Sequence, residues 1–353
     1  MNGRRTGHIV SSRAVVTVVA LVTACGGLVT HAQDAFRFKS GVDLVNVTAT
    51  VTDDDGRVVA SLTKDDFTIF ENGRRQEISH FSNERTPVSL GIALDASGSM
   101  TPDKMAAARS AIDRFIYDLL GEDDELFFLE FSSTARITQG WTTDRAAISR
   151  AVGRVDPVGG TALYDAVARA LPVAAAGRHK KKAVLVISDG NDTSSSISVA
   201  RLRQQIRDSE VLVYALGVDG TARSETPRSR PPIGLPIPNP FPQPRTRGRT
   251  PGLPPPIIGG GSGGGTWGRP AGERVNPDAL RDVTDETGGR TEIVRGFGEL
   301  QAATARLADE LSRQYSLAFS STEEKDGRWH PIRVETRDRR FTVRARRGYT
   351  ASS

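Results

Sequence analysis

Cysteine and histidine are both scarce in this chain. Among its 353 residues there is one cysteine, Cys25, and the five histidines stand far apart. A single cysteine close to the N-terminus excludes a disulfide and thiol chemistry in the mature domain. The scattered histidines lack the spacing that a zinc site requires. Disulfide scaffolds and zinc modules are therefore both excluded.

Acidic side chains are absent from the first 32 residues, which carry Arg4, Arg5 and Arg13. The segment 221–274 is also basic, with eight arginines against two glutamates. These segments contribute +3 and +6 to a net charge of +5, so the rest of the chain carries −4. A nucleic-acid-binding face needs Lys and Arg clustered on structured elements. The charge distribution thus argues against nucleic acid as a partner.

The N-terminal apolar stretch, Ala14 to Ala24, is shorter than the ~20 residues that a membrane span needs. Arginines before it and small residues after it are typical of a secretion signal. Cleavage before Gln33 would make residues 1–32 a signal peptide. Alternatively, Val22-Thr23-Ala24-Cys25 resembles a bacterial lipobox, which would place a lipid anchor at Cys25. A third possibility is that the segment stays uncleaved as a membrane anchor. We expect an exported protein, periplasmic or on the cell surface.

Residues 33–86 predict a small β-domain, because short alternating segments follow one another there. Expected strands are 42–51, 58–62, 67–70 and 77–81, and Asn72-Gly73 marks a hairpin. The acidic run at Asp53 favours a solvated turn over a calcium loop. The final segment, 321–353, shows strand signals again and predicts a β-hairpin that packs on the N-terminal β-domain.

Residues 87–320 alternate between strand and helix patterns, which predicts an α/β domain with a Rossmann-like, doubly wound, mostly parallel sheet. Expected strands are 88–94, 126–131, 183–187, 211–218, 292–294 and 315–319, the last closing the domain. Residues 221–275 interrupt the pattern with thirteen of the nineteen prolines and a glycine-rich run. Such a composition builds no core, so we expect a disordered surface loop.

Oxygen-bearing side chains cluster at three predicted strand-to-helix loops. Asp95-Ala96-Ser97-Gly98-Ser99 follows the first buried strand, Gly159-Gly160-Thr161 opens a helix, and Ser188-Asp189-Gly190 ends the most apolar strand. In open parallel sheets, ligands lie beyond the carboxyl ends of the strands. Two carboxylates and three hydroxyls suit a hard cation such as Mg²⁺. The predicted metal ligands are Asp95, Ser97, Ser99, Thr161 and Asp189.

These three segments, in this order, resemble the metal-ion-dependent adhesion site (MIDAS) of von Willebrand factor A domains. The resemblance spans residues 88–319 apart from the insertion. It implies a bound Mg²⁺, with Mn²⁺ or Ca²⁺ as alternatives, and a protein partner that supplies an Asp or Glu carboxylate to the metal. Leu62–Phe67, Glu71–Gly73 and Arg344–Tyr349 more narrowly resemble exported bacterial proteins described as VWFA-related.

The expected function is a metal-dependent protein-binding or adhesion module of the bacterial cell envelope, not an enzyme. One alternative is a scaffold whose metal site is vestigial. A metal-assisted hydrolase is a second alternative, with Asp192 as the nearby candidate for a general base. The favoured interpretation of Asp192 is a polar loop residue without a catalytic role.

Overall fold

The computed structural model describes residues 43–219 and 275–351. The predicted signal peptide (1–32), Cys25 and nearly all of the Pro/Gly-rich insertion lie outside the described residues. Val275, the last residue of that predicted insertion, is described and packs against the core beside one sheet face. None of the described helices is long and apolar enough to cross a membrane.

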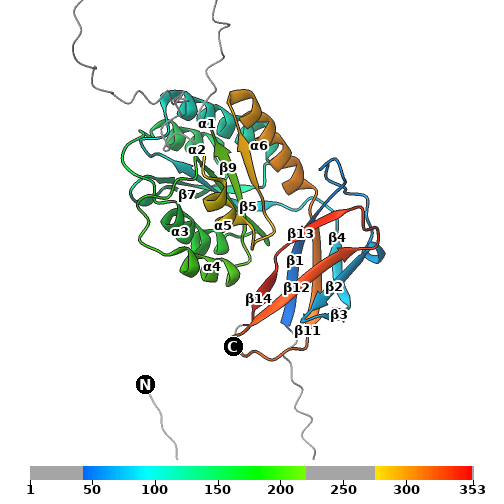
Figure 1. The fold of residues 1–353 in the computed structure, drawn as a ribbon. Coiled ribbons are helices and arrows are strands. Elements are labelled where there is room, and N and C mark those ends of the chain that lie inside the picture. Colours follow the sequence, from blue (N-terminus) through cyan, green and yellow to red (C-terminus); the bar gives the residue numbers. More distant parts are fainter. Residues whose placement is uncertain (1–42, 220–274, 352–353) are drawn as a thin grey trace, which may run out of the picture. The chain divides into compact units, whose positions relative to one another are not determined.

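Six strands form the central sheet, in the order β10-β9-β8-β5-β6-β7 (Figure 1). All neighbours in this sheet are parallel except β6 and β7, which are antiparallel. The central strands are buried on both faces, which explains their almost continuous apolar sequences. The strands are β5 (Val88–Asp95), β6 (Glu125–Phe131), β7 (Ala135–Thr142), β8 (Lys181–Ser188), β9 (Leu212–Val218) and β10 (Thr291–Val294).

Helices cover both faces of this sheet, as the alternating pattern predicts. On one face lie α1 (Pro102–Arg114), α2 (Arg145–Gly153) and α6 (Phe297–Ser312), and on the other lie α3 (Leu163–Ala175), α4 (Val199–Arg207) and α5 (Pro277–Thr284). A π-helical turn, Phe115–Leu119, continues α1. Each face has its own apolar core. The predicted doubly wound α/β fold is confirmed.

A second module consists of two four-stranded sheets, β13-β1-β11-β4 and β14-β12-β2-β3. Both chain ends build it, since β1 pairs with β11 and β13, and β2 pairs with β12 (Figure 1). Its core includes Val45, Val47, Ala49 and Val51 on one face of β1. The strands are β1 (Asp43–Thr52), β2 (Phe67–Glu71), β3 (Arg74–Gln76), β4 (Ile78–Ser82), β11 (Tyr315–Ser321), β12 (Trp329–Thr336), β13 (Thr342–Ala345) and β14 (Gly348–Thr350), and a short 3₁₀ helix (Lys64–Asp66) precedes β2.

The strand at 315–319 does not close the α/β domain, so the predicted boundary at residue 320 is wrong. It is part of β11, which lies between β1 and β4 in the β-module. The side chains of Tyr315, Leu317 and Phe319 share one face and enter that module's core. This period of two suits an antiparallel sheet with one exposed face, whereas the central parallel strands are apolar on both faces.

Three further expectations need correction. The C-terminal segment is not a hairpin of consecutive strands, because β12 pairs with β2 and β14 whereas β13 pairs with β1 in the other sheet. The expected strand 58–62 is reduced to a single bridge between Val58 and Thr52. The antiparallel edge strand β7 was not predicted, although its burial alternates along most of its length.

A buried polar network connects the β-module to α6. Glu310 of α6 accepts hydrogen bonds from the hydroxyls of Tyr214, at 3.0 Å, and Thr50, at 3.3 Å. Its other carboxylate oxygen lies 2.6 Å from an Arg344 nitrogen and 3.3 Å from Arg290 Nε. Glu310 is almost fully buried, so its charge depends on these partners. One carboxylate thus joins β1, β9, α6 and β13.

We expect Glu310→Ala to destabilise the protein by up to about 3–5 kcal/mol, because it removes a buried carboxylate and leaves the half-buried Arg344 without its counter-ion. Asp309→Ala is the matched control on the same helix, since Asp309 pairs with Arg313 at the surface. That control should cost less than about 1 kcal/mol. Urea unfolding midpoints, at equal slope, measure both changes. Equal effects of the two variants would contradict the role given to Glu310.

Candidate metal site

The candidate site lies where β5 and β8 end side by side. These strands are parallel neighbours, with Leu94 opposite Ile187. Asp95 is the last residue of β5, and Asp189 follows Ser188 at the end of β8. Both aspartates are fully buried. The fold therefore brings together two carboxylates that lie 94 positions apart in the sequence.

Asp95 is held by two donors. Its Oδ1 accepts a hydrogen bond from the Ser97 amide at 2.8 Å, and its Oδ2 accepts one from the Ser188 hydroxyl at 2.5 Å. Burial raises the pKa of Asp95 to about 6 although these bonds act in the opposite direction, and the nearby Asp189 charge adds to the rise. The fold thus places a carboxylate where its charged form is disfavoured.

Ser97 and Ser99 point their hydroxyls toward one another, with the two Oγ atoms 2.9 Å apart. Backbone hydrogen bonds anchor their loop to the segment that carries Thr161. The Gly98 amide donates to Gly159 O at 2.9 Å, and the Val158 amide donates to Ala96 O at 2.7 Å. Two of the three predicted segments are thereby joined directly.

Thr161 connects that pair of segments to the third. It is buried, and its carbonyl accepts hydrogen bonds from the amides of Thr193 and Ser194 at 2.8 and 3.0 Å. Its own amide donates to the Thr193 hydroxyl at 2.9 Å. Thr193 lies four residues beyond Asp189, so all three segments converge on the same end of the sheet.

Glycine is required directly after Asp189. Gly190 has a φ of 77°, and a Cβ at this position would lie 2.5 Å from Asn276 O. The Asn276 amide in turn donates to Asp189 O at 2.8 Å. The side chain of Asn276 caps α5. The start of α5 thus holds the backbone of Asp189 in place.

Two residues of the site were not predicted as members of it. Ser188 bonds to Asp95, as described above. Lys104, in the first turn of α1, is only 4% exposed; its Nζ donates to Ser99 O at 3.1 Å and lies 3.5 Å from Asp189 Oδ2. A sequence signal for Lys104 exists, because it stands four positions before Ala108 on the inward face of the helix. A charged lysine side chain is, however, typical of a surface residue.

The chemistry of these residues fits a hard divalent cation. Every donor group among the five predicted ligands is an oxygen, from two carboxylates and three hydroxyls. In residues 43–219 and 275–351, no cluster of three or more His, Cys, Asp and Glu side chains could hold a metal. The buried, destabilised carboxylate of Asp95 is the observation that favours a cation here. The neighbouring ammonium of Lys104 is an additional charge that the sequence pattern did not predict.

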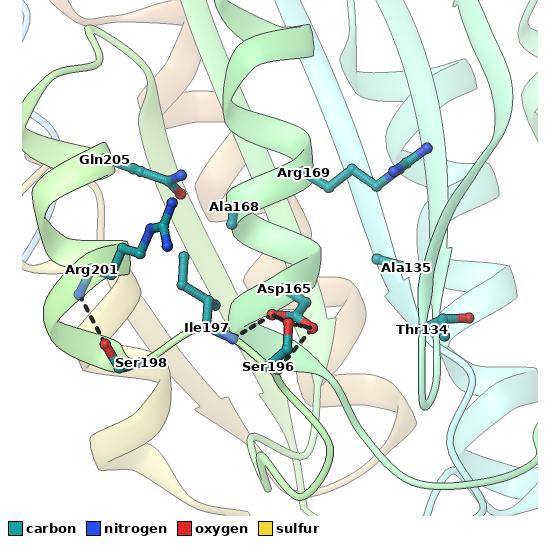
Figure 2. A pocket seen from close by; sticks show the side chains of 10 residues that line it. All are labelled: Thr134, Ala135, Asp165, Ala168, Arg169, Ser196, Ile197, Ser198, Arg201 and Gln205. Carbon is teal, nitrogen blue, oxygen red and sulfur yellow. Dashed lines mark hydrogen bonds between the residues drawn. The ribbon is translucent and has the colours of Figure 1, made fainter.

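A groove of about 600 Å³ lies between α3 and α4, near the tip of the β6–β7 hairpin (Figure 2). None of the five predicted ligands lines it. Its lining residues are Thr134, Ala135, Asp165, Ala168, Arg169, Ser196, Ile197, Ser198, Arg201 and Gln205. The groove is therefore separate from the candidate metal site.

Hydrogen bonds along this groove attach the loop after Asp189 to α3. Asp165 accepts from the amides of Ser196 and Ile197 at 2.9 and 3.0 Å (Figure 2). Burial alone would raise the pKa of Asp165, but these bonds outweigh it and the pKa is lowered. Asp192 accepts from the Leu163 amide at 2.9 Å and caps the start of α3. The loop is thus fixed at two points.

The central part of the chain is similar to a known domain family. Residues 90–191 match the family model of the von Willebrand factor type A domain. The match includes all three segments that carry the predicted ligands. An uncharacterized protein of Synechocystis sp. is 30% identical over 139 residues, which are 38% of this chain and 33% of the relative. The chain thus spans about a third of that relative's length.

Three solved structures illustrate the range of proteins to which this chain is similar. BatB from Bacteroides thetaiotaomicron is 20% identical with a TM-score of 0.42, covering 63% of this chain and 98% of its own. A von Willebrand factor type A protein from Catenulispora acidiphila is 15% identical with a TM-score of 0.46, and the match covers 89% of this chain and 74% of its own. Proximal thread matrix protein 1 from the mussel byssus, with a zinc-occupied MIDAS motif, is 14% identical with a TM-score of 0.45. The match covers 69% of this chain and 50% of its own.

Without divalent metal, we expect Asp95 to make the protein less stable as pH rises. Its pKa is 3.8 when unperturbed and about 6 in the fold, so the folded state holds the proton more tightly. The stability from this group is complete below pH 4 and is lost as pH rises through 6. The whole change is at most about 3 kcal/mol, at about 1.4 kcal/mol per pKa unit.

Urea unfolding in EDTA between pH 4 and 7 checks this expectation as a difference between the parent and Asp95→Asn. The variant should lack the decline. Asp165→Asn is the control of opposite sign, because the pKa of Asp165 is lowered and its contribution grows with rising pH. Coincident profiles of the parent and Asp95→Asn would show that the fold does not disfavour the Asp95 charge.

Proposed function

We propose that this protein is a metal-dependent protein-binding module of the bacterial cell envelope. Asp95, Ser97, Ser99, Thr161 and Asp189 would hold a divalent cation, Mg²⁺ in the first instance, with Mn²⁺ or Ca²⁺ as alternatives. A partner protein would bind by placing an Asp or Glu carboxylate on that cation. The resemblance of the three ligand segments to the adhesion site of von Willebrand factor type A domains supports this proposal.

The main support for this proposal is the burial of two carboxylates at one edge of the sheet. Two fully buried carboxylates stand at adjacent strand ends, and the hydroxyls of Ser97 and Ser99 lie 2.9 Å apart beside them. Burying two like charges is unfavourable unless a cation neutralises them. The structure contains the ammonium of Lys104 next to Asp189, whereas the partners of Asp95 within residues 43–219 and 275–351 are serine donors of hydrogen bonds. A divalent cation would relieve this imbalance.

The ligand set also indicates why a partner would be acidic. Mg²⁺ takes oxygen ligands in near-octahedral geometry. Five side chains, three of them neutral hydroxyls, leave room for a further ligand and supply only two negative charges. A carboxylate is an anionic oxygen ligand of suitable size, so an exposed Asp or Glu of another protein would complete the coordination.

A catalytic role is less well supported by the geometry. Asp192, the candidate base of a hydrolase, accepts hydrogen bonds from the Leu163 amide and the Ser195 hydroxyl. Its carboxylate is thus occupied in capping α3. Among the described residues, His80 lies on β4 and His330 lies on β12. His179 precedes the start of β8, whereas Asp189 follows the end of that strand. We therefore propose binding, not catalysis.

The proposed location follows from the N-terminal signal rather than from the fold. An arginine-bearing leader with a short apolar stretch favours export, either with cleavage before Gln33 or with a lipid anchor at Cys25. A metal-bridged partner site is suited to the cell surface or the periplasm. Lipidation would be visible as a mass increase and membrane association that Cys25→Ser abolishes.

The first experiment is thermal melting of the full chain after EDTA treatment, titrated with Mg²⁺, Mn²⁺ and Ca²⁺. A cation that binds only the folded state stabilises it by about 2.7 kcal/mol at 100 times its Kd. We expect a saturable rise in Tm for the parent and none for Asp95→Ala. Asp156→Ala serves as the matched control, because Asp156 is an exposed carboxylate in the loop before Gly159.

Three outcomes distinguish the metal-dependent binding module from a structural ion and from a scaffold with a vestigial site. A response of the parent and of Asp156→Ala, but not of Asp95→Ala, would support the site. Loss of folding in Asp95→Ala at every metal concentration would indicate a structural ion. An unresponsive parent would favour a scaffold with a vestigial site and would contradict the metal-dependent function.

A further inference from the structure

Lys104 is a buried cation inside the candidate metal site. Its Nζ donates to Ser99 O at 3.1 Å and lies 3.5 Å from Asp189 Oδ2. The side chain is 4% exposed, so water screens its charge poorly. Removing a lysine from water is costly, and the single ion pair with Asp189 offsets that cost only in part. The stability of α1 does not account for a buried lysine at this position.

The charges of the site can be counted. Asp95 and Asp189 contribute −2 and Lys104 contributes +1, which leaves −1 before metal binding. A divalent cation would bring the total to +1. Without Lys104 the loaded site would be neutral. Because all three groups are buried, this difference of one charge acts in a medium of low effective dielectric.

We propose that Lys104 sets the preference of the metal site for an anionic ligand, at the expense of metal affinity. The proposal rests on the proposed function, because it requires that a divalent cation binds at Asp95. Lys104 repels the incoming cation, so it weakens metal binding. Once the cation is bound, Lys104 keeps the site positive and favours a carboxylate over water or a neutral oxygen. Lys104 is thus a specificity-determining residue that need not touch the metal.

The position of Lys104 supports this role in a second way. It lies in the first turn of α1, and its ammonium group is anchored to the carbonyl of Ser99. Ser99 is itself a predicted ligand through its hydroxyl. The charge is therefore fixed relative to the loop that would hold the cation, and it cannot swing into solvent as a surface lysine does.

The chain offers a matched control in Lys181. It is also 4% exposed, and its Nζ also donates to a backbone carbonyl, Leu311 O, at 2.8 Å. Lys181 begins β8, however, whereas Asp189 follows its end. Ser188 stands seven positions after Lys181 along the strand, a length of roughly 23 Å. Lys181→Met removes a similar buried ammonium without changing the charge near Asp95.

The test compares the full-length parent with Lys104→Met, Lys104→Gln and Lys181→Met after EDTA treatment. Isothermal titration gives the Kd for Mg²⁺ at constant ionic strength. We expect both Lys104 variants to bind Mg²⁺ about tenfold or more tightly, while Lys181→Met keeps the Kd of the parent. Lys104→Gln retains a donor for Ser99 O, so it covers the case in which the methionine variant does not fold.

Acetate is the carboxylate probe in the second half of the test. With saturating Mg²⁺, acetate should raise the Tm of the parent more than chloride does at equal ionic strength. This increment should fall at least severalfold in the Lys104 variants and persist in Lys181→Met.

Unchanged or weaker Mg²⁺ binding by both Lys104 variants would overturn the proposal and leave Lys104 with a structural role. Unchanged acetate increments would also overturn it. A parent that binds no Mg²⁺ would contradict the proposed function itself, and this result is recognisable before any variant is made.

Discussion

Parallel pairing of β5 with β8 places the ends of two apolar strands at one point, with Leu94 opposite Ile187. The candidate site depends on this pairing, because Asp95 ends one strand and Asp189 follows the other. The strands that remove water from the core also remove it from these carboxylates. The hydrophobic stability of the sheet and the electrostatic cost at its edge therefore have one origin.

Three kinds of group share that cost. The Ser188 hydroxyl and the Ser97 amide donate to Asp95, the Lys104 ammonium faces Asp189, and a divalent cation is the third, proposed group. Hydrogen bonds alone leave the pKa of Asp95 raised. A site neutralised only by fixed protein groups would have no reason to bind a partner. The proposed cation would supply the positive charge that the protein's own groups leave missing at this edge of the sheet.

The sequence predicted most of the α/β domain, because strongly apolar strands and periodic helices leave few alternatives. It also predicted the five candidate ligands, since each follows a strand or opens a helix at the same edge. It did not predict Lys104, because a lysine next to an apolar stripe normally reaches solvent. Nor did it predict that Glu310 would meet Thr50, since a contact across 260 positions depends on how two modules pack.

The assignment of 315–319 to the wrong sheet has a similar cause. Local alternation identifies a strand but not its neighbour, and sequential strands usually lie close together in space. Here the chain leaves α6 and enters the β-module, where β11 finds β1 from the other end of the chain. The edge strand β7 was not predicted, although Ala135, Ile137 and Trp141 alternate with polar residues along it.

The pairing of β1 with β11 also sets an order of events during synthesis. Asp43 stands opposite Ser321, so β1 lacks a central partner until the ribosome has added about 270 further residues. At about 5–20 residues per second, that wait is on the order of ten to fifty seconds. The central sheet and its helices, which end at Ser312, are complete before then. The β-module therefore cannot complete its strand pairing before β11 is made, and the apolar face of β1 is open to mispairing in the meantime.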